Sequence, residues 1–164
     1  MDRYLYFLIF LILGFLIGAS VFFTFIVAPL LFSHFNHRLA GEITNIIFPY
    51  YFGIGWILGI VIYTIIAILS TKNKEILRKL KYFVIGISIY IISSMALHKA
   101  ILPIGQTLNS QYYQLLDEKK EPEAEQIKEK FKTIHSISSA INLFNIILLL
   151  FLFYNLYTTK KEEL

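Results

Sequence analysis

Hydrophobic residues fill four long stretches of the chain, at about residues 4–32, 46–69, 82–102 and 137–157. Each stretch reaches the length of about 20 residues that a helix needs to cross a bilayer core. None contains Asp, Glu or Arg, and Lys99 lies near an end, where its side chain can reach the headgroups. Because backbone groups in lipid must bond within their own segment, the pattern predicts helices. We therefore expect an all-α, integral membrane four-helix bundle, formed as a single domain over residues 1–164.

The composition supports the same class of protein. Hydrophobic residues make up 57% of the chain and charged residues only 16%, against about a quarter charged residues in soluble domains. A soluble enzyme, a disordered protein and a basic nucleic-acid module are therefore excluded. The formal net charge of +4 does not imply a nucleic-acid partner, because the charges lie outside the apolar stretches.

Basic residues predict how the bundle is oriented. They flank the chain start, the connection between the second and third stretches, and the C-terminal tail: Arg3, Lys72, Lys74, Arg78, Lys79, Lys81, Lys160 and Lys161. Because segments rich in Lys and Arg stay inside, we expect both termini in the cytoplasm, with the protein in the bacterial inner (plasma) membrane.

The longest connection, residues 104–134, carries both acidic and basic residues and is expected outside. Pro122 followed by Glu123 is typical of a helix start, with acidic groups near the positive end of the helix dipole. The fourth helix is therefore expected to begin near Glu123 and to enter the membrane around His135. This extension is either a solvated helix or a docking surface for a partner.

Few residues can carry covalent chemistry. The chain has no cysteine, which excludes a disulfide framework, a thiolate metal site and a thiol nucleophile. Glycine-rich phosphate loops, the Gly-x-Ser-x-Gly elbow and the His-Glu-x-x-His pair are also absent. An enzyme is thus the less favoured interpretation, and we assign no catalytic residue.

The candidate site lies in the expected outer half of the bundle. His98 lies five residues before Pro103, about 7 Å inside the outer end of the third stretch, and an ionisable side chain at that depth suggests a functional site. Polar side chains in the fourth stretch share one helical face. Our cofactor-binding candidates are His98, His135, Ser138 and Asn142, and Asn145 extends that face. Our metal-ligand candidates are His34, His98 and His135.

Several ligands fit this set. Histidine can bind haem or a transition metal, so haem b or a metal ion is the first expectation and a quinone or other lipid-soluble compound the second. In a purely structural alternative, His98 and His135 hydrogen-bond to each other across two helices. Packed helices lie about 8–10 Å apart, so a haem ligated from both sides would need a wider separation.

Glycine and proline positions predict packing. Gly14 with Gly18, and Gly55 with Gly59, are small-residue pairs that let helices approach closely. We expect this packing within the bundle, and the alternative is a dedicated dimer face. Pro29 lies near the end of the first helix. Pro49 is expected in the first turn of the second helix, where its missing N–H costs little.

Three short motifs carry a family resemblance. They are Ala28-Pro29-Leu30-Leu31-Phe32, then Phe48-Pro49-Tyr50-Tyr51-Phe52, and Phe131 to His135 continuing through Ser138 to Asn142. In this order they resemble the small four-helix membrane family called domain of unknown function 4149, which includes animal transmembrane protein 205. The resemblance covers roughly residues 14–150. It implies a four-helix membrane protein with polar motifs at one side, and no catalytic chemistry.

We therefore expect an integral membrane binding protein with a His/Asn/Ser pocket in the outer half of the bundle. The alternatives are an accessory or scaffolding subunit of a larger membrane complex, and a small-solute or quinone-handling membrane protein. The expected partners are the lipid bilayer and either another membrane protein or a second copy of the chain.

Overall fold

The computed structural model describes residues 2–72 and 74–161, which are almost entirely helical and contain no strand. This confirms the predicted all-α class. The helices follow in the order α1 (Asp2–Phe22), η1 (Phe23–Val27), α2 (Ala28–His34), α3 (His37–Lys72), α4 (Glu75–Lys79), α5 (Lys81–Ala96), η2 (Leu97–Ile101), α6 (Leu102–Asp117) and α7 (Glu121–Lys161). The segments η1 and η2 are π-helical turns within longer helices.

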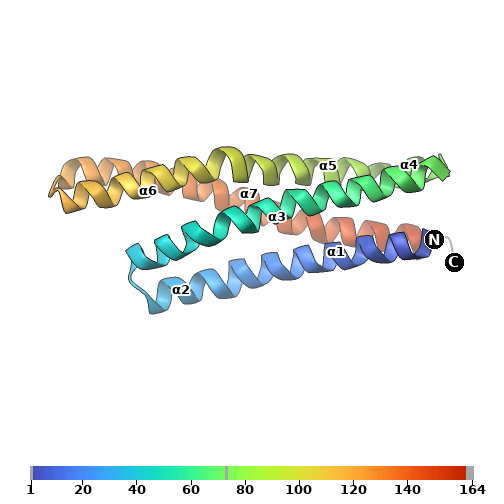
Figure 1. The fold of residues 1–164 in the computed structure, drawn as a ribbon, viewed down its shortest axis with the longest axis horizontal. Helices are drawn as coiled ribbons and strands as arrows, with labels where there is room; N and C mark the ends of the chain where they lie inside the picture. The colour runs from blue at the N-terminus through green and yellow to red at the C-terminus, as the bar shows by residue number, and fades with distance from the viewer. Residues whose placement is uncertain (1, 73, 162–164) are drawn as a thin grey trace.

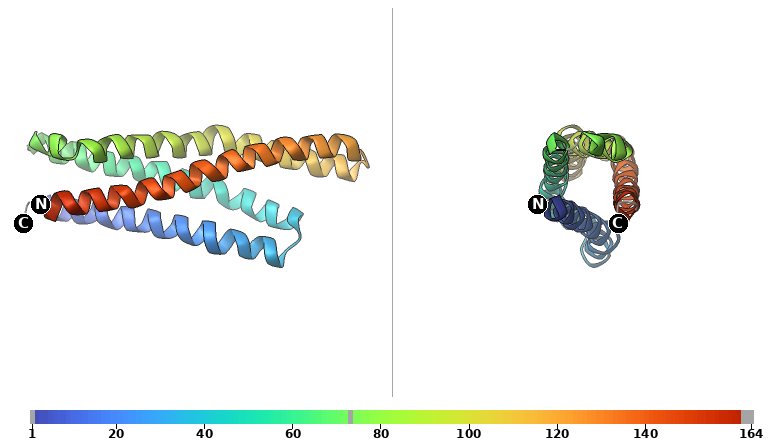
Figure 2. Two further views of the ribbon diagram at one scale, coloured as in Figure 1. Left: turned by 180° about the vertical axis from the view of Figure 1, so that it is seen from behind. Right: turned by 90° about the vertical axis from the view of Figure 1, so that its right-hand side faces the viewer.

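The helices form four long rods that run up and down side by side (Figure 1). Both ends of the chain lie near α4 at one end, and the α2–α3 and α6–α7 turns lie at the other. Seen end-on, the tilted rods surround a common centre (Figure 2), with α1 next to α3 and α7, and α5 next to the same two helices. Every rod therefore has one face toward a shared interior.

Four described helices are long and apolar enough to cross a membrane: Arg3–His34, His37–Thr71, Lys81–Asp117 and Glu121–Lys160. The third is 37 residues long, so it extends for about 55 Å, against about 30 Å of bilayer hydrocarbon. The structure thus adds long helical extensions to the apolar stretches. His98 accordingly does not lie near the outer end of its helix, because the helix continues past Pro103 to Asp117.

The second rod begins earlier than its apolar stretch indicated. Asn36 caps α3, accepting a hydrogen bond from the Leu39 N–H on its side-chain oxygen at 2.9 Å. Pro49 therefore lies inside α3, and the expectation that it stands in the first helical turn is wrong. The apolar pattern did not indicate the preceding turns because most of their exposed residues are polar, namely His37, Arg38 and Glu42 beside Leu39.

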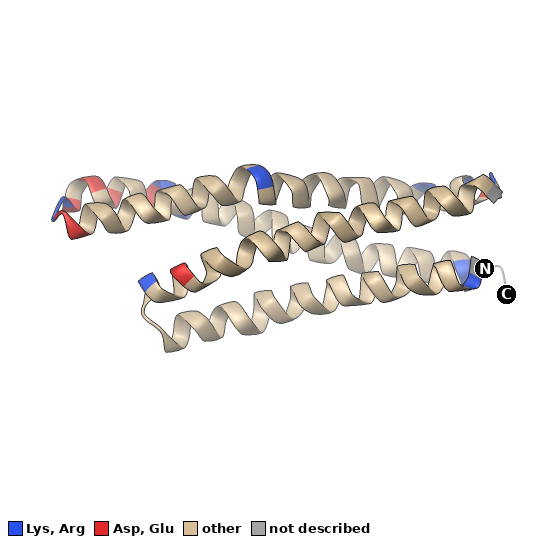
Figure 3. Cartoon of the chain, in the orientation of Figure 1, with Lys and Arg blue, Asp and Glu red and all other residues tan. Residues whose placement is uncertain are grey.

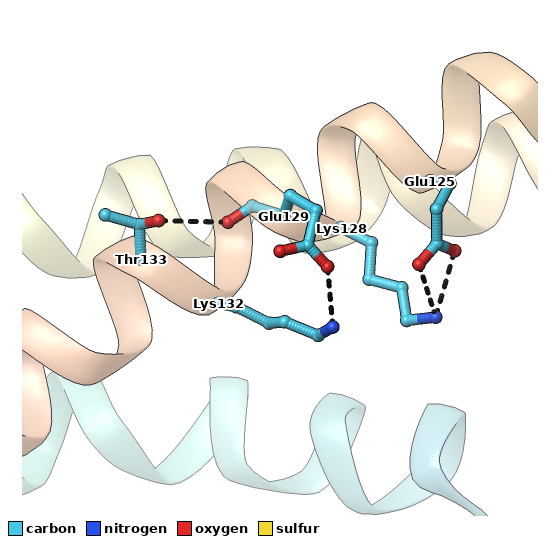
Figure 4. A network of polar contacts seen from close by, with 5 residues as sticks. All are labelled: Glu125, Lys128, Glu129, Lys132 and Thr133. Atoms are coloured by element: carbon cyan, nitrogen blue, oxygen red, sulfur yellow. Dashed lines mark hydrogen bonds and ion pairs between the residues drawn. The ribbon is translucent and has the colours of Figure 1, made fainter.

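The predicted extension of the fourth helix is confirmed, with α7 starting at Glu121. Its first turns carry ion pairs at helical spacing: Lys128 binds Glu125 at 2.9 Å and Lys132 binds Glu129 at 2.6 Å (Figure 4). The connection before it is a tight turn with Lys119 in the left-handed region, at φ 59°. There Lys120 and then Gln114 donate hydrogen bonds to Glu118 and hold the pKa of its carboxyl below the ordinary value.

The apolar core fills the end of the bundle that holds the chain termini. Its fully buried members come from all four rods, including Ile9 and Leu13 of α1, Ile62 of α3, Phe83 of α5 and Leu152 of α7. Most charged residues gather near the two ends of the molecule (Figure 3). Most polar side chains of the interior lie between this apolar core and the opposite end, whereas Asn155, whose Oδ1 is buried, lies beside the core.

Candidate functional site

Asn142 of α7 joins three rods through its side-chain amide. Its carbonyl oxygen accepts a hydrogen bond from the Tyr51 hydroxyl of α3 at 2.9 Å, and its Nδ2 donates to Thr24 Oγ1 of η1 at 3.0 Å. All three side chains are partly buried. The predicted inward orientation of Asn142 is explained by these bonds, because an unpaired amide in lipid is costly.

Asn145 makes a second set of bonds one turn along α7. Ser93 Oγ donates to its Oδ1 at 2.6 Å, and its Nδ2 donates to Ser94 Oγ at 3.3 Å. Asn145 and Ser94 are buried, at 4% and 3% exposure. Together, Thr24, Tyr51, Ser93, Ser94, Asn142 and Asn145 form what we call the polar layer.

A cavity of about 80 Å³ adjoins the polar layer and is lined by all four rods. Its polar lining consists of uncharged side chains: Ser20, Tyr51, Tyr90, Ser94, Asn142 and Asn145. The apolar lining includes Phe15 and Ile54, which are 56% and 45% exposed on the outside of the bundle. The cavity therefore reaches the surface between α1 and α3, where the protein faces lipid.

Glycines of α3 make room for the side chains of α5. A Cβ at Gly55 would stand 3.0 Å from the Tyr90 hydroxyl, and one at Gly59 would stand 2.8 Å from Ile91 Cγ1. The predicted packing role of this pair is confirmed. The same prediction for Gly14 and Gly18 is wrong, because nothing among the described residues lies within 4 Å of a Cβ built at either position.

His98 binds Trp56, not His135. The indole Nε1–H of Trp56 donates to His98 Nδ1 at 2.9 Å, and the two rings stack with centroids 6.3 Å apart. Gly53 permits this, since a Cβ there would lie 3.4 Å from His98 Cε1. Because an indole can only donate, Nδ1 must accept, and the proton of a neutral ring is then on Nε2. In this arrangement His98 offers a ligand a hydrogen-bond donor and no free ring lone pair.

The other predicted site residues contact neighbours other than His98. His135 is exposed and stacks on Phe131 of its own helix. His34 is exposed and is bonded through Nδ1 to Ser33 Oγ and to the Leu30 carbonyl. Ser138 is partly buried but does not line the cavity. Within residues 2–72 and 74–161, no three His, Asp or Glu side chains are grouped as a metal ion would need.

The two π-helical turns supply two of the polar groups. Thr24 lies in η1 and His98 in η2, and each turn ends two residues before a proline, Pro29 and Pro103. Proline removes a backbone donor and π-turns rearrange the local ladder, so both favour a local change of helix geometry. Sequence reasoning missed Thr24, Ser20, Tyr51 and Tyr90. The available signal was their position as polar groups inside apolar stretches.

Comparison with known proteins assigns the chain to a family. Residues 11–114 match the family described as Domain of unknown function (DUF4149). A protein from Aquifex aeolicus (strain VF5), itself described as an "Uncharacterized protein", is 45% identical over 47 residues, which cover 29% of this chain and 36% of that protein. No solved structure matches the chain.

Proposed function

The chain belongs to the Domain of unknown function (DUF4149) family, and we propose that this member is an intramembrane binding protein for the polar end of a neutral, lipid-soluble compound. The observation that carries the proposal is the Ser20 hydroxyl. Ser20 is 7% exposed, lines the cavity, and makes no hydrogen bond to another described residue. A hydroxyl that faces the cavity without a protein partner is free to bond to a bound polar group, and that bond stabilises the complex.

The lining favours a neutral ligand with a hydroxyl or carbonyl group. Among the residues that the structure describes, hydroxyls and amides line the cavity and no charged side chain does. An ion would therefore lose its hydration without gaining an opposite charge. Each amide nitrogen of Asn142 and Asn145 carries a second N–H beyond the one already bonded to Thr24 or Ser94. These groups can donate to a carbonyl, and Ser20 can donate or accept.

The size of the cavity limits what can enter. At about 80 Å³ it has about half the volume of an engineered cavity of ~150 Å³ that takes benzene. A whole aromatic ring therefore does not fit without movement of the helices. We propose that one hydroxyl or carbonyl enters while the apolar body of the compound stays in lipid beside Phe15 and Ile54.

Trp56 provides a direct test. It is the only tryptophan and follows Gly55, which lines the cavity. In lipid nanodiscs, titration with 1-decanol and with decyl-1,4-benzoquinone should change Trp56 fluorescence saturably, whereas decane should not. Ser20→Ala and Asn145→Leu should weaken binding of at least one of these two probes by about tenfold, as expected for loss of one or two hydrogen bonds.

Ser88→Ala is the matched control, because the Ser88 hydroxyl binds the Val84 carbonyl of its own helix and does not line the cavity. Equal responses to decanol, benzoquinone and decane would refute the proposal. An absorption spectrum and metal analysis of the same sample test the haem and metal prediction for His34, His98 and His135. A stoichiometric Soret band lost in His98→Ala would favour haem over the neutral ligand.

We also propose that the protein lies in a bacterial inner membrane with both termini in the cytoplasm. The Aquifex relative supports a bacterial origin. The basic residues near α4 and the chain start support the orientation through the positive-inside rule. The polar layer would then lie in the outer half of the membrane, as the sequence predicted for the pocket.

A further inference from the structure

A second, larger cleft lies between the start of α3 and the end of α6, and it shares no lining residue with the cavity. Its volume is about 420 Å³, which is within the range of about 300–1,000 Å³ for small-molecule sites. The residues that matter for its chemistry are Arg38, Glu42, Asn109, Tyr113, Asp117 and Glu118. All belong to the end of the bundle opposite the chain termini.

Asn109 forms the innermost polar part of this cleft. It is 9% exposed and lines the cleft, and its amide makes no hydrogen bond to any residue that the structure describes. The amide lies over Gly41, where a Cβ would stand 3.4 Å from Asn109 Nδ2. A nine-tenths buried amide that faces a cleft without a partner is a group prepared to bind a ligand.

The charges around Asn109 favour a cation. The positive charge of Arg38 is already paired with carboxylates. Its two terminal nitrogens donate to the two oxygens of Asp117 at 3.0 Å each, and its Nε lies 3.6 Å from Glu42. Its guanidinium also lies 5.2 Å from the ring centre of Tyr113. The cleft therefore presents three carboxylates, those of Glu42, Asp117 and Glu118, against one guanidinium in its lining. Glu118 is further bound by Lys120, which leaves Glu42 as the carboxylate with the weakest contact to a cation.

We propose that this cleft binds a small organic cation through a primary ammonium group, with the Asn109 carbonyl oxygen and the Glu42 carboxylate as acceptors. An ammonium has three N–H donors and no acceptor, so it matches an amide oxygen next to a carboxylate. Two sources supply this group: a free amine in solution and the headgroup of phosphatidylethanolamine. The site is independent of the proposed intramembrane cavity.

The test uses the full chain in phosphatidylcholine nanodiscs, whose lipid carries no N–H. Binding of putrescine is measured by calorimetry, with 1,4-butanediol as the neutral probe and succinate as the anionic probe. Putrescine alone should bind. Glu42→Gln and Asn109→Leu should weaken its binding about tenfold or more, the loss expected for one hydrogen bond to a charged group. Asn109→Asp should strengthen binding, which a merely destabilised protein would not show.

Glu125→Gln is the matched control, because Glu125 pairs with Lys128 on α7 and does not line the cleft. In a second arm, the discs contain some phosphatidylethanolamine, and mass spectrometry measures the lipid retained by each variant. Retention that depends on Glu42 and Asn109 without putrescine binding identifies the headgroup as the source, and the reverse identifies a free amine. The proposal would be overturned if neither putrescine binding nor phosphatidylethanolamine retention is detected, or if binding is unaffected by the substitutions at Glu42 and Asn109.

Discussion

At the scale of single residues, Asn142 connects three helices through one amide. Asn142→Leu leaves the Tyr51 and Thr24 hydroxyls without this partner, so we expect it to lower the free energy of unfolding. Hydrogen bonds between membrane helices contribute about 0.6 kcal/mol on average and up to about 1.7 kcal/mol. We expect a loss of about 1–2 kcal/mol, measured by unfolding in mixed micelles with increasing SDS.

A double-mutant cycle with Tyr51→Phe separates the hydrogen bond from packing. If the bond matters, the double variant loses less than the sum of the single variants. Strictly additive losses would show that Asn142 stabilises the bundle only by filling space. Ser88→Ala, which removes a hydroxyl bonded within one helix, serves as the comparison for loss of a polar group.

The glycines give a second residue-scale prediction. Gly59→Ala should destabilise the bundle by about 1–3 kcal/mol, the range for overpacking, because its Cβ would lie 2.8 Å from Ile91 Cγ1 and 3.4 Å from Tyr90. Gly18→Ala should be neutral or mildly stabilising, since the space beside Gly18 is open among the described residues. The same SDS titration compares them. Equal costs would contradict the close packing of α3 against α5.

The residue types in the sequence predicted some members of the site but not the residues to which those members bond. Asn142 and Asn145 could be predicted because an amide inside an apolar stretch must turn toward other helices. Their partners Tyr51 and Ser93 could not, because one helix face does not specify which residue on a neighbouring helix lies opposite. His98 shows the same limit: its depth marked it as interior, but Trp56, on another helix, decides which ring nitrogen is free.

At the scale of helices, the apolar stretches predicted the number and order of the rods. They could not predict where each helix begins and ends, because hydropathy indicates which residues can contact lipid and does not indicate how far the helical backbone extends. The start of α3 depends on the Asn36 cap, and the start of α7 on a turn and on surface ion pairs such as Glu125–Lys128. These are local interactions in water, and they leave no apolar signal.

The Arg38–Asp117 pair leads to a prediction at this scale. It joins the start of α3 to the end of α6 through two hydrogen bonds of 3.0 Å. Both side chains are about half exposed, so Arg38→Ala should change stability by at most about 1 kcal/mol. It should nevertheless broaden the α3–α6 distance distribution between spin labels at Leu39 and Gln111, measured by pulsed electron resonance.

The charge reversal Arg38→Asp with Asp117→Arg is the control for that experiment. It rebuilds an opposite-charge pair between the same two helices and should restore the narrow distribution. If Arg38→Ala leaves the distribution unchanged, then α3 and α6 are held by other contacts, such as the bond from Gln106 Nε2 to the Asn45 carbonyl at 2.9 Å.

At the scale of the whole molecule, the interior of the bundle becomes more polar from the end with the chain termini to the opposite end. The end that holds the termini has a mainly apolar core with the buried Asn155 Oδ1 beside it, the middle holds the polar layer, and the opposite end holds the charged cleft. Amides and hydroxyls between the helices stabilise the bundle, and those that line the cavity can also bond to a ligand. The gradient therefore fits a protein that receives ligands from the lipid or from the charged side, and not from the end with the apolar core.

At the same scale, the positive-inside rule predicts the orientation of the bundle. The chain is well suited to test it by cysteine labelling, because it has no cysteine of its own. Single cysteines replace Leu77 in α4, Gln126 in α7 and Ile147 in the apolar part of α7, all exposed on the protein surface. In intact spheroplasts, an impermeant maleimide should label Gln126→Cys alone. Leu77→Cys should react only after the membrane is opened, and Ile147→Cys in neither state, because lipid covers it. Labelling of Leu77→Cys first would reverse the orientation. It would place the polar layer in the inner half and give the ammonium cleft access to the cytoplasm.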